Sequence, residues 1–130
     1  MKTIAVCLSE LTKANVEIGF CAVFANDGEL VACDDKAHRQ FEWKAVVRSL
    51  TTVATSGGEV AKQLGMGTWT PQQTDNIIST STDEGHIVMM PINPQLWLAC
   101  VVTVWLTPLG LVYLDMSRTA REIDEVVSGQ

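Results

Sequence analysis

The longest run of the chain without a charged side chain extends from Ile87 to Leu114. Pro91, Pro94 and Pro108 interrupt it, and its longest continuous apolar piece, Leu96 to Leu106, is shorter than the roughly 20 residues that a helix needs to cross a bilayer. Val, Trp and Leu predominate in this piece and suit a strand buried on both faces. The run therefore predicts a strand, a turn and a helix, without membrane insertion.

Two shorter apolar runs, Glu17 to Ala25 and Glu29 to Asp34, are rich in residues that favour strands, and Asn26-Asp27-Gly28 joins them. Asp-Gly tolerates the positive φ angles of a tight hairpin turn. These residues predict an antiparallel hairpin, followed by a polar loop at Asp34-Asp35-Lys36.

Residues 2 to 14 fit two structures. Ile4, Leu8 and Leu11 have the helical spacing i, i+4, i+7, and Lys13 closes the segment, which indicates a short amphipathic helix. The run Ile-Ala-Val-Cys-Leu that begins at Ile4 suits a strand equally well, so the pattern leaves both structures open.

A long amphipathic helix is predicted from about Phe41 to Leu64, with Gly65 placed to end it. Its apolar positions recur at steps of three and four residues: Val46, Leu50, Val53, Gly57, Val60 or Ala61, and Leu64.

The other side of this helix carries no charge from Ser49 to Gly58, although exposed helix sides usually do. The outward positions are Ser49, Thr52, Thr55 and Ser56. Gly57-Gly58 costs about 1 kcal/mol per glycine relative to Ala, a penalty more easily tolerated where another backbone comes close. Two interpretations follow: this side contacts a second copy of the chain, or it is a surface that tolerates small residues.

After a connection at Trp69-Thr70-Pro71, strands are predicted at Thr74 to Thr80 and at His86 to Ile92, with a turn at Asp83-Glu84-Gly85 between them. Leu96 to Leu106 is the last strand. The order helix, strand, strand, helix, strand, strand, strand, helix predicts one α+β domain over residues 1 to 130, with a mostly antiparallel sheet and helices to cover both faces.

The closing helix is expected to begin at Thr107-Pro108, because Thr is an acceptable N-cap and proline is favoured at the first helical position. Its apolar stripe is Leu109, Val112, Met116, Ala120, Ile123 and Val127. The charged residues Asp115, Arg118, Arg121, Glu122, Asp124 and Glu125 are expected to face water.

Composition narrows the function. The 130 residues are 47% hydrophobic and carry a formal net charge of −6, with only nine Lys and Arg spread along the chain. This weighs against binding to nucleic acid or anionic membranes, which need clustered basic residues. The four cysteines lie in apolar stretches without a Cys-x-x-Cys pair, so buried thiols and a reducing, cytoplasmic compartment are expected.

No catalytic or metal-ligating constellation is recognisable. His38 and His86 are far apart and neither neighbours a second ligand, and the Asp34-Asp35 pair lacks further oxygen ligands. Ser56-Gly57-Gly58-Glu59 and Gly65-Met66-Gly67-Thr68 lack the Gly-Lys-Ser/Thr ending of a phosphate-binding loop, and no Gly-x-Ser-x-Gly elbow exists. We therefore expect no cofactor, no metal and no enzymatic activity.

The tryptophans are more informative. Trp97 and Trp105 lie eight residues apart in one predicted strand, so they are expected to share a face and to pack in the core. Trp43, at the charged start of the long helix, is either a partner-binding anchor or a cover for the sheet edge.

Several segments resemble the roadblock family, which includes roadblock-type dynein light chains and bacterial and archaeal regulators of Ras-like GTPases. The similar segments are the hairpin Gly19 to Asp34, the helix ending at Gln63-Leu64-Gly65, the hairpin Asn76 to Pro91, and the helix Leu109 to Ile123, including Ser117 to Glu122. The resemblance implies a profilin-like α+β domain with five strands, one long helix on one sheet face and the terminal helices on the other.

The resemblance also implies a homodimer in which the third strands join edge to edge and the long helices lie side by side. It implies no catalysis by the chain alone, but an adaptor, or a regulator that binds a Ras-like small GTPase and adjusts its nucleotide cycle. The residues expected in self-association are Ser49, Thr52, Ser56, Gly57, Glu59, Gln63, Thr74, Asn76 and Ile78.

A profilin-like or PAS-like sensor that binds a small ligand between sheet and helix is the alternative. Such a pocket needs a few convergent polar groups, and the predicted apolar faces offer few of them.

Overall fold

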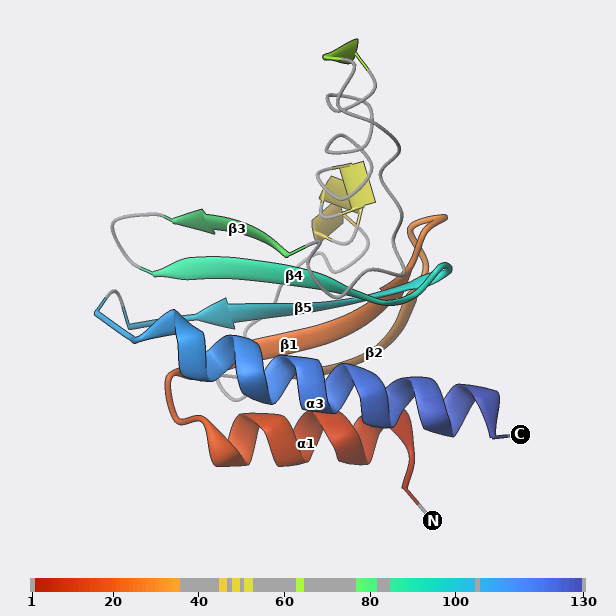
Figure 1. Cartoon of the computed structure of the whole chain (residues 1–130), viewed down its shortest axis with the longest axis horizontal. Helices are drawn as coiled ribbons and strands as arrows, with labels where there is room; N and C mark the ends of the chain where they lie inside the picture. Colours follow the sequence, from red (N-terminus) through yellow and green to blue (C-terminus); the bar gives the residue numbers. More distant parts are fainter. Residues whose placement is uncertain are drawn as a thin grey trace.

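In the computed structural model, the described residues are 2–35, 45–46, 48–49, 51–52, 63–64, 77–81, 85–104 and 106–129. They build an antiparallel sheet of five strands, with helix α1 (Ile4–Ala14) and helix α3 (Leu109–Ser128) on one face. The two helices lie side by side and run in opposite directions (Figure 1). None of the described helices has the length and apolar content of a membrane span.

The strands are β1 (Ile18–Ala25), β2 (Leu30–Asp35), β3 (Ile78–Ser81), β4 (His86–Asn93) and β5 (Leu96–Val102), in the spatial order β2-β1-β5-β4-β3. Every neighbouring pair is antiparallel, which confirms the predicted sheet. The first and last strands are neighbours at the centre of the sheet, where Cys21 pairs with Cys100 and Val23 with Leu98. β2 and β3 are the two edge strands.

The hairpin of β1 and β2 forms as predicted around Gly28, whose φ of 92° is accessible at low cost only to glycine. The polar loop expected at Asp34-Asp35-Lys36 is wrong in its first two residues, because β2 continues to Asp35. Asp35 pairs with Phe20 of β1, and the Asp34 carboxylate accepts a hydrogen bond from the hydroxyl of Thr12 on α1. The pairing with β1 and the hydrogen bond from α1 therefore extend the strand.

The N-terminal segment is a helix, which settles the alternative left open by its pattern. Thr3 caps it: its side-chain oxygen accepts a 3.2 Å hydrogen bond from the backbone N–H of Val6. Cys7, Leu8 and Leu11 are buried against the sheet and against α3. The sheet and α3 bury this apolar side, and this packing favours the helix over the strand. Only the folded chain provides it.

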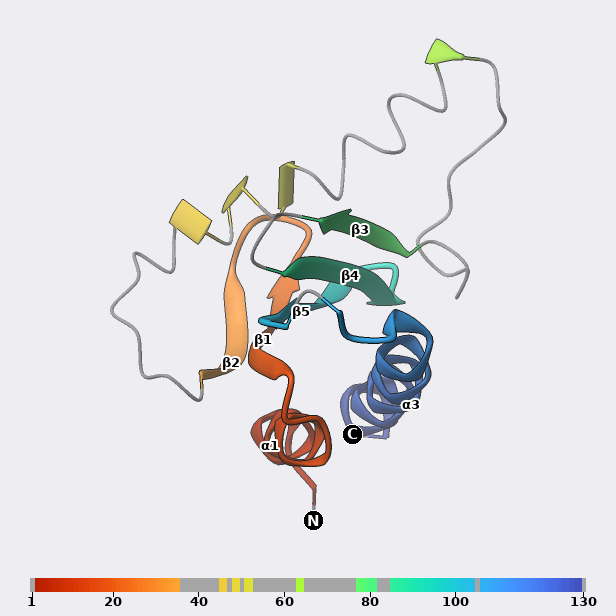
Figure 2. The same cartoon turned by 90° about the vertical axis from the view of Figure 1, so that its left-hand side faces the viewer.

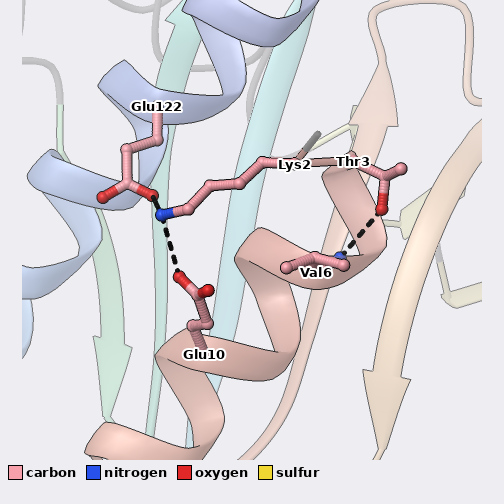
Figure 3. Close-up of polar contacts among 5 residues, drawn as sticks. All are labelled: Lys2, Thr3, Val6, Glu10 and Glu122. Atoms are coloured by element: carbon pink, nitrogen blue, oxygen red, sulfur yellow. Dashed lines mark hydrogen bonds and ion pairs between the residues drawn. The ribbon is translucent and has the colours of Figure 1, made fainter.

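An ion cluster links the start of α1 to the middle of α3 (Figure 3). The Lys2 ammonium lies 3.1 Å from a Glu10 carboxylate oxygen and 3.0 Å from a Glu122 carboxylate oxygen. These two hydrogen bonds, to Glu122 and then to Glu10, raise the pKa of Lys2 above its ordinary value. The cluster is partly exposed, so it orients the two helices more than it stabilises the fold.

The predicted end of the last strand at Leu106 is wrong. β5 ends at Val102, after which the Thr103 N–H and hydroxyl both donate to the Glu17 carbonyl and the chain turns at Val104 to Thr107. Helix α3 begins at Leu109, with Pro108 as its N-cap and no side-chain cap, so the predicted Thr107 cap is also wrong. Thr107 instead donates its N–H to the Val104 carbonyl.

The stripe predicted on α3 is confirmed for Val112, Met116, Ala120 and Ile123, which are buried. Val127 is wrongly included: it exposes 40% of its surface because it lies past the last buried turn of the helix.

Residues on the two sheet faces form two clusters. Val23, Val88, Leu98 and Cys100 pack with α1 and α3 on one face, and Phe24, Met89, Trp97 and Ala99 form the cluster on the other. The indole N–H of Trp97 donates to the Asn26 side chain at 2.9 Å. Trp97 is a core residue as predicted, whereas Trp105 lies outside the described residues.

The second cluster faces the side on which the described residues of the predicted long helix lie (Figures 1 and 2). Ala45, Val46, Arg48, Ser49, Thr51, Thr52 and Gln63 have helical backbone. Thr51 lies against the β1–β2 turn, since its hydroxyl is 3.9 Å from the place that a Cβ on Gly28 would take. Leu64 is exposed in a turn, so its assignment to the apolar stripe is wrong.

Candidate functional site

The outer edge of β3 is the first candidate for a binding surface. β3 pairs with β4 from Ile78 opposite Met89 to Ser81 opposite His86, and no strand among the described residues pairs with its other side. An edge strand presents backbone N–H and C=O groups that a strand of another chain can bind. The position of β3 is therefore the one required for the edge-to-edge contact that the resemblance implies.

The side chains of β3 suit such a contact. The strand reads Ile-Ser-Thr-Ser and carries no charge. Ile78 packs on the second core cluster, while Ser79 and Ser81 are exposed. Natural edge strands usually avoid association by carrying charged residues or proline, and β3 has neither.

One end of β3 is held by a side-chain pair across the strands. The Ser81 hydroxyl lies 2.7 Å from Nδ1 of His86, and His86 is buried at the start of β4. His86 therefore is the strand-end residue that its position next to a turn suggested, with a structural contact to β3.

Gly85 precedes His86, where the start of β4 lies close beside the end of β5. A Cβ at this position would lie 2.0 Å from the carbonyl oxygen of Val102, which is backbone and moves only with its strand. Only glycine fits this close approach without a shift of the β5 backbone.

The helical residues on the same side of the sheet are the second candidate surface. Ser49, Thr52 and Gln63 are exposed, as predicted for a surface that contacts another chain. The Thr52 hydroxyl donates to the Arg48 carbonyl at 3.0 Å, which satisfies the hydroxyl within its own helix. Because this hydroxyl is bonded within its own helix, the surface around Thr52 presents one free donor fewer to a partner.

The predicted self-association residues therefore divide into two groups. Ser49, Thr52, Gln63 and Ile78 lie in the described part of the chain: the first three each have helical backbone, and the last is on the edge strand. Ser56, Gly57, Glu59, Thr74 and Asn76, with the predicted anchor Trp43, lie outside the described residues.

Three of the four thiols, those of Cys7, Cys33 and Cys100, have raised pKa values. Burial raises the pKa of the Cys100 thiol well above its ordinary value, and its hydrogen bond with Cys21 adds to the shift. Burial also raises the pKa of Cys7 and of Cys33. Protonated thiols are poor nucleophiles and metal ligands, and no group of three His, Cys, Asp or Glu gathers within the described parts of the chain. Cys33 is exposed on β2, so the expectation of four buried cysteines is wrong for this one.

Two open grooves of about 320 Å³ each border α3. One lies between α3 and β4, with Arg121, Asp124 and Ser117 facing the apolar residues Met90, Pro91 and Ile92. The other lies between α1 and α3 and is lined by Glu10, Glu122 and Arg118, of which the two carboxylates already pair with Lys2. Both volumes are near the lower end of the range for small-molecule sites.

Besides Val6 and Val31, five exposed apolar side chains were missed by the sequence analysis. They are Val16, Val104, Leu106, Leu111 and Leu114. Leu111 and Leu114 fall between the stripe positions of α3, and this departure from the period is the signal that marks them as outward residues. Val104 and Leu106 were instead assigned to a buried strand.

The sequence itself has no match among protein-family models and none among curated proteins. Solved structures match the fold over nearly the whole chain. MglB of Myxococcus xanthus has a TM-score of 0.82 at 15% sequence identity and covers 98% of this chain and 96% of its own. A roadblock/LC7 domain from Streptomyces avermitilis has a TM-score of 0.82 at 8% identity and covers 98% and 99%.

A structure described as MglB with tetrameric arrangement has a TM-score of 0.77 at 17% identity, with 97% of this chain and 88% of its own covered. The chain therefore has the roadblock/LC7 fold, and the fold that the sequence resemblance implied is confirmed.

Proposed function

We propose that this chain is a non-enzymatic, cytoplasmic member of the roadblock family that forms a homodimer and binds a Ras-like small GTPase as its regulator or scaffold. Two observations support the proposal: the fold is shared with MglB over 98% of the chain, and the one edge strand without charge is β3. The uncharged edge carries the argument, since it is a property of this chain itself.

In the proposed dimer, β3 of one chain pairs with β3 of the other, and the helical segments that carry Ser49, Thr52 and Gln63 lie against each other. A continuous sheet satisfies the outer backbone groups of both edge strands. Small side chains let two helices approach closely, which is the role we assign to Ser56 and Gly57 as well. Glu59, Thr74 and Asn76 complete the proposed contact.

The dimer then offers one surface to the GTPase, with Trp43 as its proposed anchor. The raised pKa values of three thiols and the lack of any catalytic motif in the sequence favour action through the residues of the GTPase. One structural neighbour is described as tetrameric, which supports further association of such dimers.

Two measurements test this proposal. Native mass spectrometry of the full chain is expected to give a ligand-free dimer, and Gly57→Trp is expected to give monomers. A monomer that retains a small molecule would instead favour the sensor, with the groove between α3 and β4 as its site.

The GTPase is identified by capture on the tagged protein from the source cell, and its affinity is then measured with purified components in the GDP and GTP-analogue states. We expect binding that depends on the nucleotide and weakens at least about tenfold in Trp43→Ala, as is typical of a tryptophan anchor. If wild type and Trp43→Ala both bound the GDP and GTP-analogue states equally well, a regulatory role would be contradicted and only a scaffolding role would be left.

A further inference from the structure

The five exposed apolar side chains identified above gather at one end of the molecule. Val16 lies in the connection between α1 and β1, Val104 and Leu106 in the connection between β5 and α3, and Leu111 and Leu114 in the first turns of α3. All three segments lie at the same end of the sheet (Figure 1). We call these five residues the leucine end.

The contacts bring the two connections together. The N–H and hydroxyl of Thr103 both donate to the carbonyl of Glu17, which places Val16 and Val104 beside a shared pair of residues. Val16 and Leu106 expose 85% and 84% of their surface, and Leu111 and Leu114 expose 64% and 68%. Large apolar side chains exposed together, in contrast to single ones, usually mark a binding surface.

The leucine end is almost free of net charge. The stretch from Thr103 to Leu114 has no charged residue. The next two charges along α3 neutralise each other, because Arg118 lies 2.8 Å from the Asp115 carboxylate. A chain of net charge −6 repels copies of itself over most of its surface. The five side chains of the leucine end are uncharged and Glu17 is the charged residue beside Val16, so two copies meet at this end with little repulsion.

Gly110 adds an independent argument. It lies four residues before Leu114 on the same side of α3, and a Cβ at this position would meet nothing within 4 Å. Glycine near the start of an exposed helix lowers its stability relative to alanine, so its own chain gains nothing from it. A second helix that crosses here gains space for close approach.

We propose that the leucine end is a contact between two copies of this chain, separate from the β3 edge, and that it joins two homodimers into a tetramer. The number of four chains rests on the proposed homodimer, whereas the contact through the leucine end does not depend on it. Leu111 and Leu114 are exposed on α3, and α3 covers a face of the sheet and does not lie along the outer edge of β3, so pairing through β3 leaves them uncovered (Figures 1 and 2). A two-fold axis through the leucine end places the two α3 helices against each other.

Sedimentation velocity of the full chain from about 1 μM to about 1 mM tests the contact over the affinity range of small interfaces. Wild type is expected to reach a tetramer, and Leu111→Gln/Leu114→Gln is expected to stop at the dimer, with association weakened at least about tenfold. Val127→Gln, which removes a partly exposed apolar residue from the far end of the same helix, is the matched control and keeps the tetramer.

Gly110→Glu is the second variant, because it creates no clash within the chain and an acidic residue in the first turn favours the helix. Two such glutamates that meet across the two-fold axis repel each other, so this variant is also expected to stop at the dimer. Added salt is expected to strengthen the wild-type contact, because it screens the repulsion between acidic chains.

The outcomes separate this contact from the proposed dimer. If the β3 dimer is wrong but the leucine end is right, wild type is a dimer that the leucine variant converts to monomers. If wild type never exceeds a dimer and the leucine variant has the same mass, the proposal is overturned. The same holds if both leucine-end variants keep the wild-type tetramer, or if salt weakens the contact.

Discussion

β2 and β3 occupy equivalent places at the two edges of one sheet, yet their outer sides are built from different residues. β2 ends in Asp34 and Asp35, and the hydroxyl of Thr12 ties Asp34 to α1. Its pairing with β1 also shifts register between Val23 and Phe24, an irregularity that bends an edge strand. β3 is four residues long, uncharged, and linked by Ser81 to His86 on its own neighbour β4.

The difference teaches how one sheet can have one closed edge and one edge open to a partner. Charges, a bend and a bond to a covering helix make it costly for another strand to approach β2. None of these three devices is present in the four residues of β3. The two edges can therefore be tested against each other with matched substitutions.

The largest expected effect comes from Gly85→Ala, which disturbs the start of β4, the strand that pairs with β3. The new Cβ would lie 2.0 Å from the Val102 carbonyl oxygen, so β4 must move away from β5. We expect a loss of about 3 kcal/mol in the free energy of unfolding, at the upper end for overpacking. Chemical denaturation measures it.

Gly110→Ala is the control for this change, since its Cβ meets nothing within 4 Å. It replaces glycine by alanine within a helix and is expected to raise stability by up to about 1 kcal/mol. Equal effects of the two substitutions would show that Gly85 is not tightly packed against the Val102 carbonyl.

The second prediction compares the edges directly. Ser79→Lys places a charge on the exposed part of β3 and is expected to raise the dimer dissociation constant at least about tenfold, because lysine on an edge strand opposes pairing. Val31→Lys places the same charge on an exposed position of β2 and is expected to leave the dimer intact. Light scattering over a dilution series measures both.

The opposite result, a dimer sensitive to Val31→Lys and not to Ser79→Lys, would assign the contact to the β2 edge. Insensitivity to both would exclude pairing through either edge.

The third prediction concerns the hydrogen bond that ties the β2 edge to α1. Thr12→Val removes the hydroxyl that donates to Asp34 and is expected to cost about 1–2 kcal/mol of stability, since it leaves a half-buried carboxylate without this donor. In an Asp34→Ala background the same change is expected to cost much less. Equal costs in both backgrounds would show that the bond contributes nothing to the edge.

The smallest effect is expected at the Lys2 cluster, which connects α1 and α3 but neither edge. Lys2→Met is expected to lower the melting temperature by no more than a few degrees at pH 7, because the ion pairs are exposed, and by less in high salt. The folded-state pKa of Lys2 is raised, so its contribution is fully present below the ordinary value of 10.5 and is lost as pH rises through the higher folded value. Thermal scans at pH 7, 9 and above 10.5 check this, and a difference that vanished between pH 7 and 9 would contradict it.

Local patterns predicted the elements whose contacts lie close in sequence. The hairpin around Gly28 follows from Asp-Gly between two β-rich runs, and the core side of α3 follows from the spacing of Val112, Met116 and Ile123. Both depend on the period of side chains along one element, which is readable without the rest of the fold.

Element ends were less predictable, because partners far away in sequence set them. β2 reaches Asp35 owing to Phe20 on β1 and Thr12 on α1, and β5 stops at Val102 where Thr103 turns to bond the Glu17 carbonyl. For the candidate site, the sequence predicted that Ile78 takes part in self-association, and the structure places Ile78 on the edge strand β3. The leucine end was not predicted, since Leu106 looks like any other strand residue until the strand is seen to end before it.

By itself, the sequence determined an α+β fold with antiparallel hairpins, because turn residues and side-chain periods act over a few neighbours. Only the tertiary structure decided that the N-terminal segment is a helix, that β3 is an edge, and that the side chains of the leucine end remain in solvent. These features depend on which distant segments take up the available backbone groups and apolar surface, and that competition is settled only when the whole chain has packed.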